Sequence, residues 1–206
     1  MNEMIEKTAE ALRKRGFDAV VCATAHEASD CVLKAAEEAR TIGFGGSETV
    51  RTMGLPEALA AAGKELLIHG DPKWTPEQRA EIMRRQSTCD LFLLSANALT
   101  TDGRLVNIDG NGNRVAASIF GPRKVVFVVG RNKLVDGGLD DAVTRIKRFA
   151  APPNCRRLGR NTPCAKTDVC ADCDSPDRIC KVTVVLDRKP SRTDTLVVLV
   201  DEDLGY

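Results

Sequence analysis

Four cysteines near the end of the chain have a spacing that is typical of metal binding. Cys164, Cys170, Cys173 and Cys180 follow one another as C-x5-C-x2-C-x6-C, and Cys155 precedes them. Thiolates bind zinc ions and iron–sulfur clusters, and disulfides or free thiols are the remaining uses of such cysteines. A structural zinc ion usually takes two separate C-x2-C pairs, whereas this segment has one such pair flanked by single cysteines. The spacing therefore favours a [4Fe–4S] cluster, with zinc as the alternative.

A glycine-rich turn is the second stretch whose residues suit chemistry. Residues 43–51 read G-F-G-G-S-E-T-V-R and follow a short apolar strand pattern. Gly45 and Gly46 leave the backbone open to a ligand, and Ser47 and Thr49 offer hydroxyl groups. The bunched glycines match neither the dinucleotide-binding pattern nor a Walker loop. The turn predicts an anion site, and the alternative is an ordinary turn with Ser47 as the N-cap of a helix.

Residues 95–114 are too rich in Asn, Asp, Gly and Arg for a simple connection. Within them, Thr101–Arg104 predicts a hairpin turn. We expect the loop after this hairpin to bind the ligand together with the glycine turn, through Asp109, Gly110, Asn113 and Arg114. Asp109 and Glu48 are also candidates for a catalytic base or nucleophile, although a carboxylate in a turn more often braces the loop.

Two further basic residues follow a strand pattern. Arg131 and Lys133 come after the apolar run of residues 124–129. Ligands of open α/β folds bind at the carboxyl ends of the strands, so both side chains are expected to join Arg114 in balancing a carboxylate or phosphate. His69 also ends a strand pattern, where a structural role is the simpler interpretation.

The elements that must position these residues alternate between helix and strand. This alternation predicts an α/β fold with a mainly parallel sheet. Regular periodicity is lost from residue 154 to residue 181, after Pro152 and Pro153, which should end the helix of residues 139–150. We therefore expect an α/β domain of residues 1–152 and 182–206, with a small irregular cysteine-rich segment at 153–181. The helical patterns cover residues 1–16, 26–39, 55–62, 75–87, 115–119 and 139–150, and the strand patterns cover 17–23, 41–45, 65–69, 90–95, 105–108, 124–129, 182–186 and 196–200.

Composition narrows the range of partners. The 206 residues include 30 basic and 29 acidic side chains, so no overall field attracts nucleic acid. The amphipathic start of the chain differs from a signal peptide, and the longest apolar runs are too short to span a bilayer. A cytoplasmic protein is expected, whose partners are small metabolites or other proteins. In that compartment the eight cysteines stay reduced unless a metal holds them.

Three segments resemble the lactate-utilisation (LUD) domain family. They are the glycine turn at 43–50, the run L-T-T-D-G-R-L-V-N-I-D-G-N-G-N-R at 99–114, and G-P-R-K-V-V-F-V-V-G-R-N-K at 121–133. The resemblance covers nearly the whole chain, and the cysteine tail matches a short bacterial form. It implies the Rossmann-like parallel sheet shared by glucosamine-6-phosphate deaminase, ribose-5-phosphate isomerase and CoA transferases, with a smaller strand insertion. It also implies a part in oxidising L-lactate to pyruvate, beside iron–sulfur protein partners.

Three functions remain open at this point. The favoured one is the binding of a small anionic or phosphorylated metabolite between the glycine turn and the 109–114 loop, in lactate or related organic-acid oxidation. A phosphosugar isomerase or acyl-transfer enzyme would use Asp109 or Glu48. However, the D-G-A-D-E type motif of the isomerases is replaced here by D-G-N-G-N at 109–113, which argues against isomerase chemistry. A structural or docking subunit of a redox complex, with a zinc site, is the third.

Overall fold

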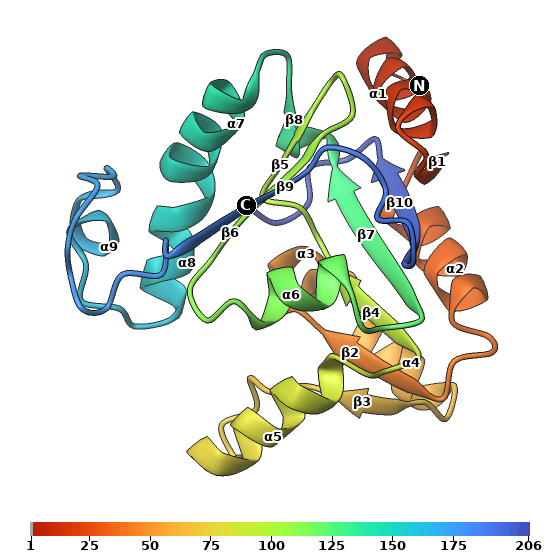
Figure 1. The fold of residues 1–206 in the computed structure, drawn as a ribbon, viewed down its shortest axis with the longest axis horizontal. Coiled ribbons are helices and arrows are strands. Elements are labelled where there is room, and N and C mark those ends of the chain that lie inside the picture. Colours follow the sequence, from red (N-terminus) through yellow and green to blue (C-terminus); the bar gives the residue numbers. More distant parts are fainter. Residues whose placement is uncertain (1) are drawn as a thin grey trace.

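The computed structural model describes residues 2–206, so Met1 of the predicted domain lies outside the described residues. A parallel sheet of six strands forms the centre of the molecule, in the order β1-β10-β7-β4-β2-β3 (Figure 1). This arrangement confirms the predicted α/β class. The strands are β1 (Asp18–Cys22), β2 (Thr41–Phe44), β3 (Glu65–Leu67), β4 (Leu91–Leu94), β7 (Lys124–Gly130) and β10 (Asp194–Val200).

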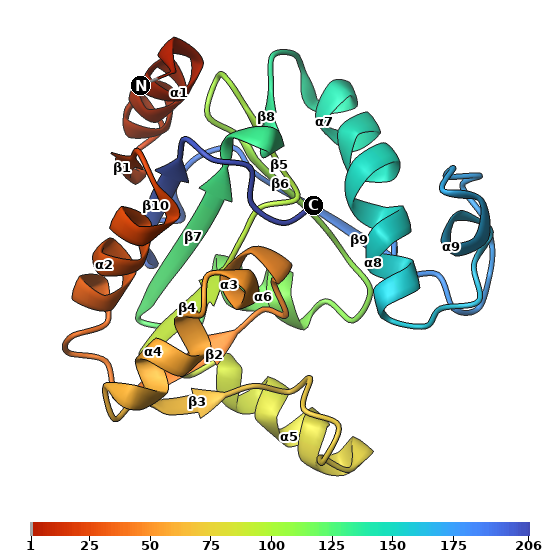
Figure 2. The same cartoon turned by 180° about the vertical axis from the view of Figure 1, so that it is seen from behind.

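Helices cover both faces of this sheet, which explains why its central strands are apolar throughout. In β7, Val126 and Val128 pack toward one face, and Val125, Phe127 and Val129 pack toward the other. The first face is visible in Figure 2 and carries three helices, α2 (Ala25–Ala35), α3 (Glu48–Thr52) and α4 (Leu55–Ala61). The opposite face carries α1 (Glu3–Lys14), α5 (Pro76–Gln86) and α6 (Asn113–Ile119).

A second sheet of four strands lies between the main sheet and α7 (Leu139–Arg145). Its order is β8-β5-β6-β9, with β5 and β6 antiparallel across the predicted hairpin turn. The last two strands of the chain thus separate, since β9 joins this small sheet while β10 enters the main one. The four strands are β5 (Ala98–Thr100), β6 (Leu105–Asp109), β8 (Leu134–Val135) and β9 (Val182–Leu186).

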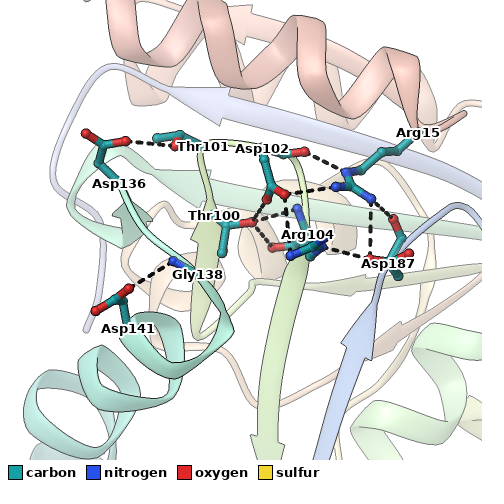
Figure 3. A network of polar contacts seen from close by, with 9 residues as sticks. All are labelled: Arg15, Thr100, Thr101, Asp102, Arg104, Asp136, Gly138, Asp141 and Asp187. Atoms are coloured by element: carbon teal, nitrogen blue, oxygen red, sulfur yellow. Dashed lines mark hydrogen bonds and ion pairs between the residues drawn. The ribbon is translucent and has the colours of Figure 1, made fainter.

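A polar network holds the hairpin turn against α1 (Figure 3). Arg15, at the end of α1, contacts Asp102 of the turn at 2.9 Å and Asp187 after β9 at 3.3 Å. Arg104 Nε donates to the same Asp187 carboxylate at 2.8 Å. One network therefore joins α1, the hairpin and the connection between the two sheets.

The prediction that Pro152 and Pro153 end the preceding helix is wrong. A π-helical turn at Ile146–Ala150 follows α7 and leads directly into α8 (Ala151–Arg157). Both prolines lie in the first turn of α8, where a missing amide hydrogen and a fixed φ are tolerated. The cysteine-rich segment is correspondingly less irregular than expected, because it contains the end of α8 and the short α9 (Pro163–Thr167). Within residues 2–206, no helix is long and apolar enough to cross a membrane.

Candidate functional site

Three loops meet at the carboxyl edge of the main sheet. They follow the neighbouring strands β2, β4 and β7, which all run in the same direction. From β2 the chain moves outward to β3, whereas from β4 it continues to β7 on the other side. The strand order therefore reverses between β2 and β4. Open α/β sheets form their ligand crevices at such a reversal.

Lys133 lies at the centre of this edge. It ends the short 3-10 helix Arg131–Lys133 after β7, and only 4% of its surface is exposed. Its Nζ donates to Thr49 Oγ1 at 2.7 Å and to Ser95 Oγ at 2.9 Å. Thr49 follows β2 and Ser95 follows β4, so this one amine connects the ends of all three strands.

The charge of Lys133 is not balanced by the protein. Among residues 2–206, no Asp or Glu oxygen lies within 4.0 Å of its Nζ. Burial, together with the charges of Arg145 and Arg114, lowers the pKa of Lys133 to about 7. Arg145 on α7 donates only to the carbonyls of Asn97 and Asn132, and burial lowers its pKa to about 10. The edge therefore holds two buried basic groups that lack an acidic partner among the described residues.

Arg114 is a third cation at this edge, and it is anchored. Its Nε donates to Asp109 Oδ2 at 3.2 Å, and its Nη2 donates to Asn97 Oδ1 at 3.1 Å and to the Ile108 carbonyl at 2.6 Å. The stem of Arg114 crosses Gly45, where a Cβ atom would lie 2.9 Å from Arg114 Cγ. Gly45 thus makes room for an arginine of the facing loop.

Neither candidate catalytic carboxylate is free. Asp109 Oδ1 accepts from the amides of Asn111 and Gly112, at 3.0 and 3.1 Å, while Oδ2 contacts Arg114. Burial alone would raise the pKa of Asp109, but the Arg114 charge and the two amides outweigh it and hold the pKa below its usual value. Glu48 is paired with Arg51 and lies 3.8 Å from Arg157. Both carboxylates act as braces of their loops.

Two cavities lie against these groups and share Arg114 and Asn154 as a common wall. The inner cavity, about 40 Å³, borders Lys133, Ser47, Glu48, Ser95, Asn97 and Tyr206. The outer cavity, about 320 Å³, extends between the 109–114 loop, α5 and the end of α8. Its charged walls are mainly basic, with Arg79, Arg114, Arg157 and Arg160 against the single carboxylate of Asp109.

The structure gathers most of the residues predicted for the ligand, though not all. Arg131 lies apart from both cavities, because its side chain pairs with Asp203 at 2.9 Å and donates to the Asp201 carbonyl. Ser47 caps α3 through Val50, as the simpler interpretation expected, and also borders the inner cavity. Thr49 contacts Lys133. The outer cavity is bordered by Gly45, Gly46, Asp109, Gly110, Asn113 and Arg114.

Several residues of the site were not predicted individually. Ser95 and Asn97 lie at the end of a strand pattern and at the start of the 95–114 stretch, which was predicted to contain site residues. Arg145, Asn154 and Arg157 come from helices that are distant in sequence, and only the packing of α7 and α8 brings them here. His69 also faces the outer cavity, where its Nδ1 lies 3.1 Å from Gln86 Nε2 and burial lowers its pKa.

The cysteine segment forms a separate centre. Five thiols line one small cavity, from Cys155 on α8, Cys164 on α9, and the loop residues Cys170, Cys173 and Cys180. Arg178 donates to the carbonyls of Cys173 and Cys180, each at 2.7 Å, and braces the loop. Within residues 2–206, no three Cys, His, Asp or Glu side chains are gathered closely enough for a single metal ion.

The donor set of this centre suits a thiolate-ligated cluster. Five cysteine thiols line one cavity, and cysteine thiolates are the usual ligands of iron–sulfur clusters. The cavity measures about 20 Å³, which is room for little more than one water molecule. Cluster binding would therefore require the 168–181 loop, which has no helix or strand, to move outward.

The fold and these two centres define the class of protein: an α/β protein with a basic crevice at the carboxyl edge of its sheet and a cysteine-rich segment beside it. The sequence profile of the LUD domain matches residues 5–200, so the chain belongs to the LUD domain family. A crystal structure of a DUF162 family protein from Deinococcus radiodurans has a similar fold, with a TM-score of 0.52 and 14% identity over 96% of each chain. Curated proteins give no match to this chain.

Proposed function

We propose that this LUD-family protein binds a small carboxylate or phosphate-bearing metabolite in the crevice between the glycine turn and the 109–114 loop. In this proposal the protein serves lactate or related organic-acid oxidation, as its family resemblance implies. The observation that carries the proposal is the pair of buried basic side chains, Lys133 and Arg145, whose charged forms have no acidic partner among residues 2–206. A buried charge is costly without a counter-charge, and an anionic ligand would supply one.

The direct test is isothermal titration with lactate, pyruvate, sugar phosphates and CoA. We expect one of these anions to bind, and Lys133→Met to weaken that binding by at least about tenfold. Lys124→Met is the matched control. Lys124 begins β7, at the end of the strand opposite to Lys133, and it pairs with Asp194 at 3.6 Å. No binding by any of these anions to the folded protein would contradict the proposal.

We further propose that Cys164, Cys170, Cys173 and Cys180 bind a [4Fe–4S] cluster, which would supply one-electron transfer. The support is the shared cavity of these thiols and their sequence spacing. Anaerobic purification, iron, sulfide and zinc analysis, and an absorption spectrum test this assignment. Iron and sulfide in equal amounts, with a broad visible absorption band, are expected. Stoichiometric zinc without iron would contradict the cluster assignment and support a zinc site instead.

The rival functions have less support. An isomerase or acyl-transfer enzyme needs a carboxylate free to act as base or nucleophile, yet Asp109 and Glu48 are engaged by Arg114 and Arg51. A docking role in a redox complex would leave the buried cations at the sheet edge unexplained. Iron–sulfur proteins remain the partners that the family resemblance implies for an electron-carrying form.

A further inference from the structure

We propose that Lys133 is a Schiff-base lysine, whose Nζ condenses with the carbonyl group of an anionic aldehyde or ketone while the acidic group of that compound binds Arg114. This inference rests on the proposed anion site and names the class of compound that the site takes. The inference goes beyond the anion site because it assigns a covalent reaction to Lys133. In a simple binding site, this side chain would contribute only its positive charge.

Hydrogen bonding directs the free electron pair of this amine. Thr49 Oγ1 donates its hydrogen to the Leu204 carbonyl at 3.0 Å, and Ser95 Oγ donates to the Ala96 carbonyl at 3.3 Å. Since each hydroxyl has one hydrogen, both hydroxyls must accept from Lys133 Nζ. A neutral amine has two N–H groups, and these two bonds use both. The lone pair of the nitrogen is then left without a hydrogen bond to the protein.

The surroundings favour the neutral amine. Its Nζ is buried and faces the positive charges of Arg145 and Arg114, which also lower the pKa of Lys133 to about 7. The other titratable groups on the inner cavity are Glu48, which Arg51 and Arg157 engage, and Tyr206. A large fraction of Lys133 is thus unprotonated near neutral pH, which is the state that an amine nucleophile requires.

Arg114 is placed to hold the acidic group. Two of its three nitrogens are engaged by protein acceptors, and within residues 2–206 its Nη1 has no hydrogen-bond partner. Arg114 also borders both cavities. A ligand whose carboxylate or phosphate binds there extends its neighbouring carbonyl into the inner cavity, where about 40 Å³ accommodates a carbonyl group with a small substituent.

The condensation needs no oxidant or reductant. The Nζ lone pair forms a bond to the carbonyl carbon, the π pair of the carbonyl moves to its oxygen, and a proton passes from nitrogen to that oxygen. The carbinolamine then gains a second proton on this oxygen and loses water as the C=N bond forms, with the nitrogen giving up its remaining excess proton. Thr49 and Ser95 lie within hydrogen-bond distance of the nitrogen that exchanges these protons.

Borohydride trapping tests the proposal. The whole protein is incubated at neutral pH with pyruvate, dihydroxyacetone phosphate or acetone, and sodium borohydride then reduces any imine to a stable amine. Intact mass and peptide mapping count and locate the adducts. Lactate, which has no carbonyl group, is the blank. The variants are Lys133→Arg and, as a matched control, Lys124→Arg at the opposite end of β7.

One adduct per chain, mapped to Lys133 in the wild type and in Lys124→Arg and absent from Lys133→Arg, is the expected result. Reaction with only one anion identifies the acidic group that Arg114 accepts, whereas equal labelling by acetone overturns the role of Arg114. Binding of pyruvate or dihydroxyacetone phosphate by titration, without an adduct at Lys133, overturns the Schiff base and leaves the anion site standing. Neither binding nor an adduct overturns both. If Lys133→Arg fails to fold, the peptide map of the wild-type protein still shows whether the adduct lies on Lys133.

Discussion

Lys133 shows, at the level of one residue, how a functional site can be recognised from a side chain that destabilises the folded protein. A buried amine with two hydroxyl partners and two neighbouring arginines destabilises its own charged form. Evolution could remove that cost with an apolar residue of similar length. The strongly shifted pKa in a crevice is therefore a functional signal with a physical basis.

The first prediction concerns the stability of Lys133→Met as a function of pH. The folded pKa of about 7 lies below the ordinary lysine pKa of 10.5, so between these pH values the unfolded state binds more protons. Wild-type stability should therefore rise with pH in this window, relative to the variant. Below about pH 7 both states carry the proton, and the penalty is constant. Lys133→Met should gain on the order of 2 kcal/mol more at pH 6 than at pH 9.

Urea unfolding of both proteins at a series of pH values measures this difference. Lys124→Met controls for the loss of a lysine charge at the other end of β7. A stability difference between wild type and Lys133→Met that is flat from pH 6 to pH 9 would show that Lys133 is not held in a charge-destabilising environment.

Single residues were predictable where a motif and a strand end coincided. Lys133 and Arg114 follow such patterns, and both belong to the crevice. Gly45 was placed in the right loop for a different reason, because its missing side chain accommodates Arg114. Arg131 has the same signal as Lys133, yet its side chain turns toward Asp203, and sequence alone does not specify that direction.

At the level of elements, the hairpin between β5 and β6 depends on one glycine. Gly103 has a φ of 90°, and a Cβ atom there would lie 2.8 Å from the carbonyl carbon of Ala11 and 2.9 Å from the Leu12 nitrogen. The turn therefore touches the backbone of α1. This contact, with the network around Arg15 and Asp102, fixes the small sheet against the main domain.

The second prediction is that Gly103→Ala destabilises the protein by more than about 2 kcal/mol, because it adds a backbone clash to the strain of positive φ. Gly63→Ala is the matched control, since Gly63 also has a positive φ of 75° but no atom within 4 Å of the added Cβ. It should lose only about 1 kcal/mol. Equal losses in chemical denaturation would mean that the turn moves away from α1 without cost.

Most of the element order was readable from the sequence because strands and helices differ in apolar period, but the short elements β5, β8 and α9 were not predicted. The junction at residues 146–153 was not predicted correctly. A rule that prolines end helices holds for helix interiors, whereas Pro152 and Pro153 occupy the first turn of a new helix after a π-turn. The distribution of β9 and β10 between two sheets was equally hidden, because local pattern contains no information on strand partners.

At the scale of the whole molecule, the two centres touch. The amide of Lys181, one residue after the last cysteine, donates to the Asp109 carbonyl at 3.0 Å. Ile179 lies against Gly110, where a Cβ atom would be 3.2 Å from the Ile179 carbonyl oxygen. Ile179 also borders both the thiol cavity and the outer anion cavity. The order of the cysteine segment therefore affects one wall of the crevice.

The third prediction is that Cys170→Ser combined with Cys173→Ser abolishes metal content and makes the segment sensitive to protease. Residues 160–181 bury few large aliphatic side chains, and Val169 is 66% exposed, so apolar burial cannot offset the entropy of ordering this segment. Thiolate coordination can contribute on the order of 10 kcal/mol. The α/β domain should still melt cooperatively. Cys31→Ser, a half-buried thiol on α2, is the control. Full metal content without new cleavage in 155–181 would rule out the four-cysteine assignment.

The fourth prediction follows from the contact between the centres: the same double variant should bind the crevice anion more weakly, by about fivefold to thirtyfold, or about 1 to 2 kcal/mol. The loop in which we propose the cluster supplies Ile179 to the crevice wall and positions the Asp109 carbonyl through Lys181. Asp109 in turn holds Arg114, so looseness in the segment reaches the group that we expect to bind the anion. Titration of the wild type with the anion, before and after removal of the proposed cluster, measures the same coupling without a mutation. Linkage requires the reciprocal effect, namely that the bound anion raises the metal affinity of the segment by the same factor. Unchanged anion affinity in both metal-free forms would show that the Ile179 contact transmits no energy between the two centres.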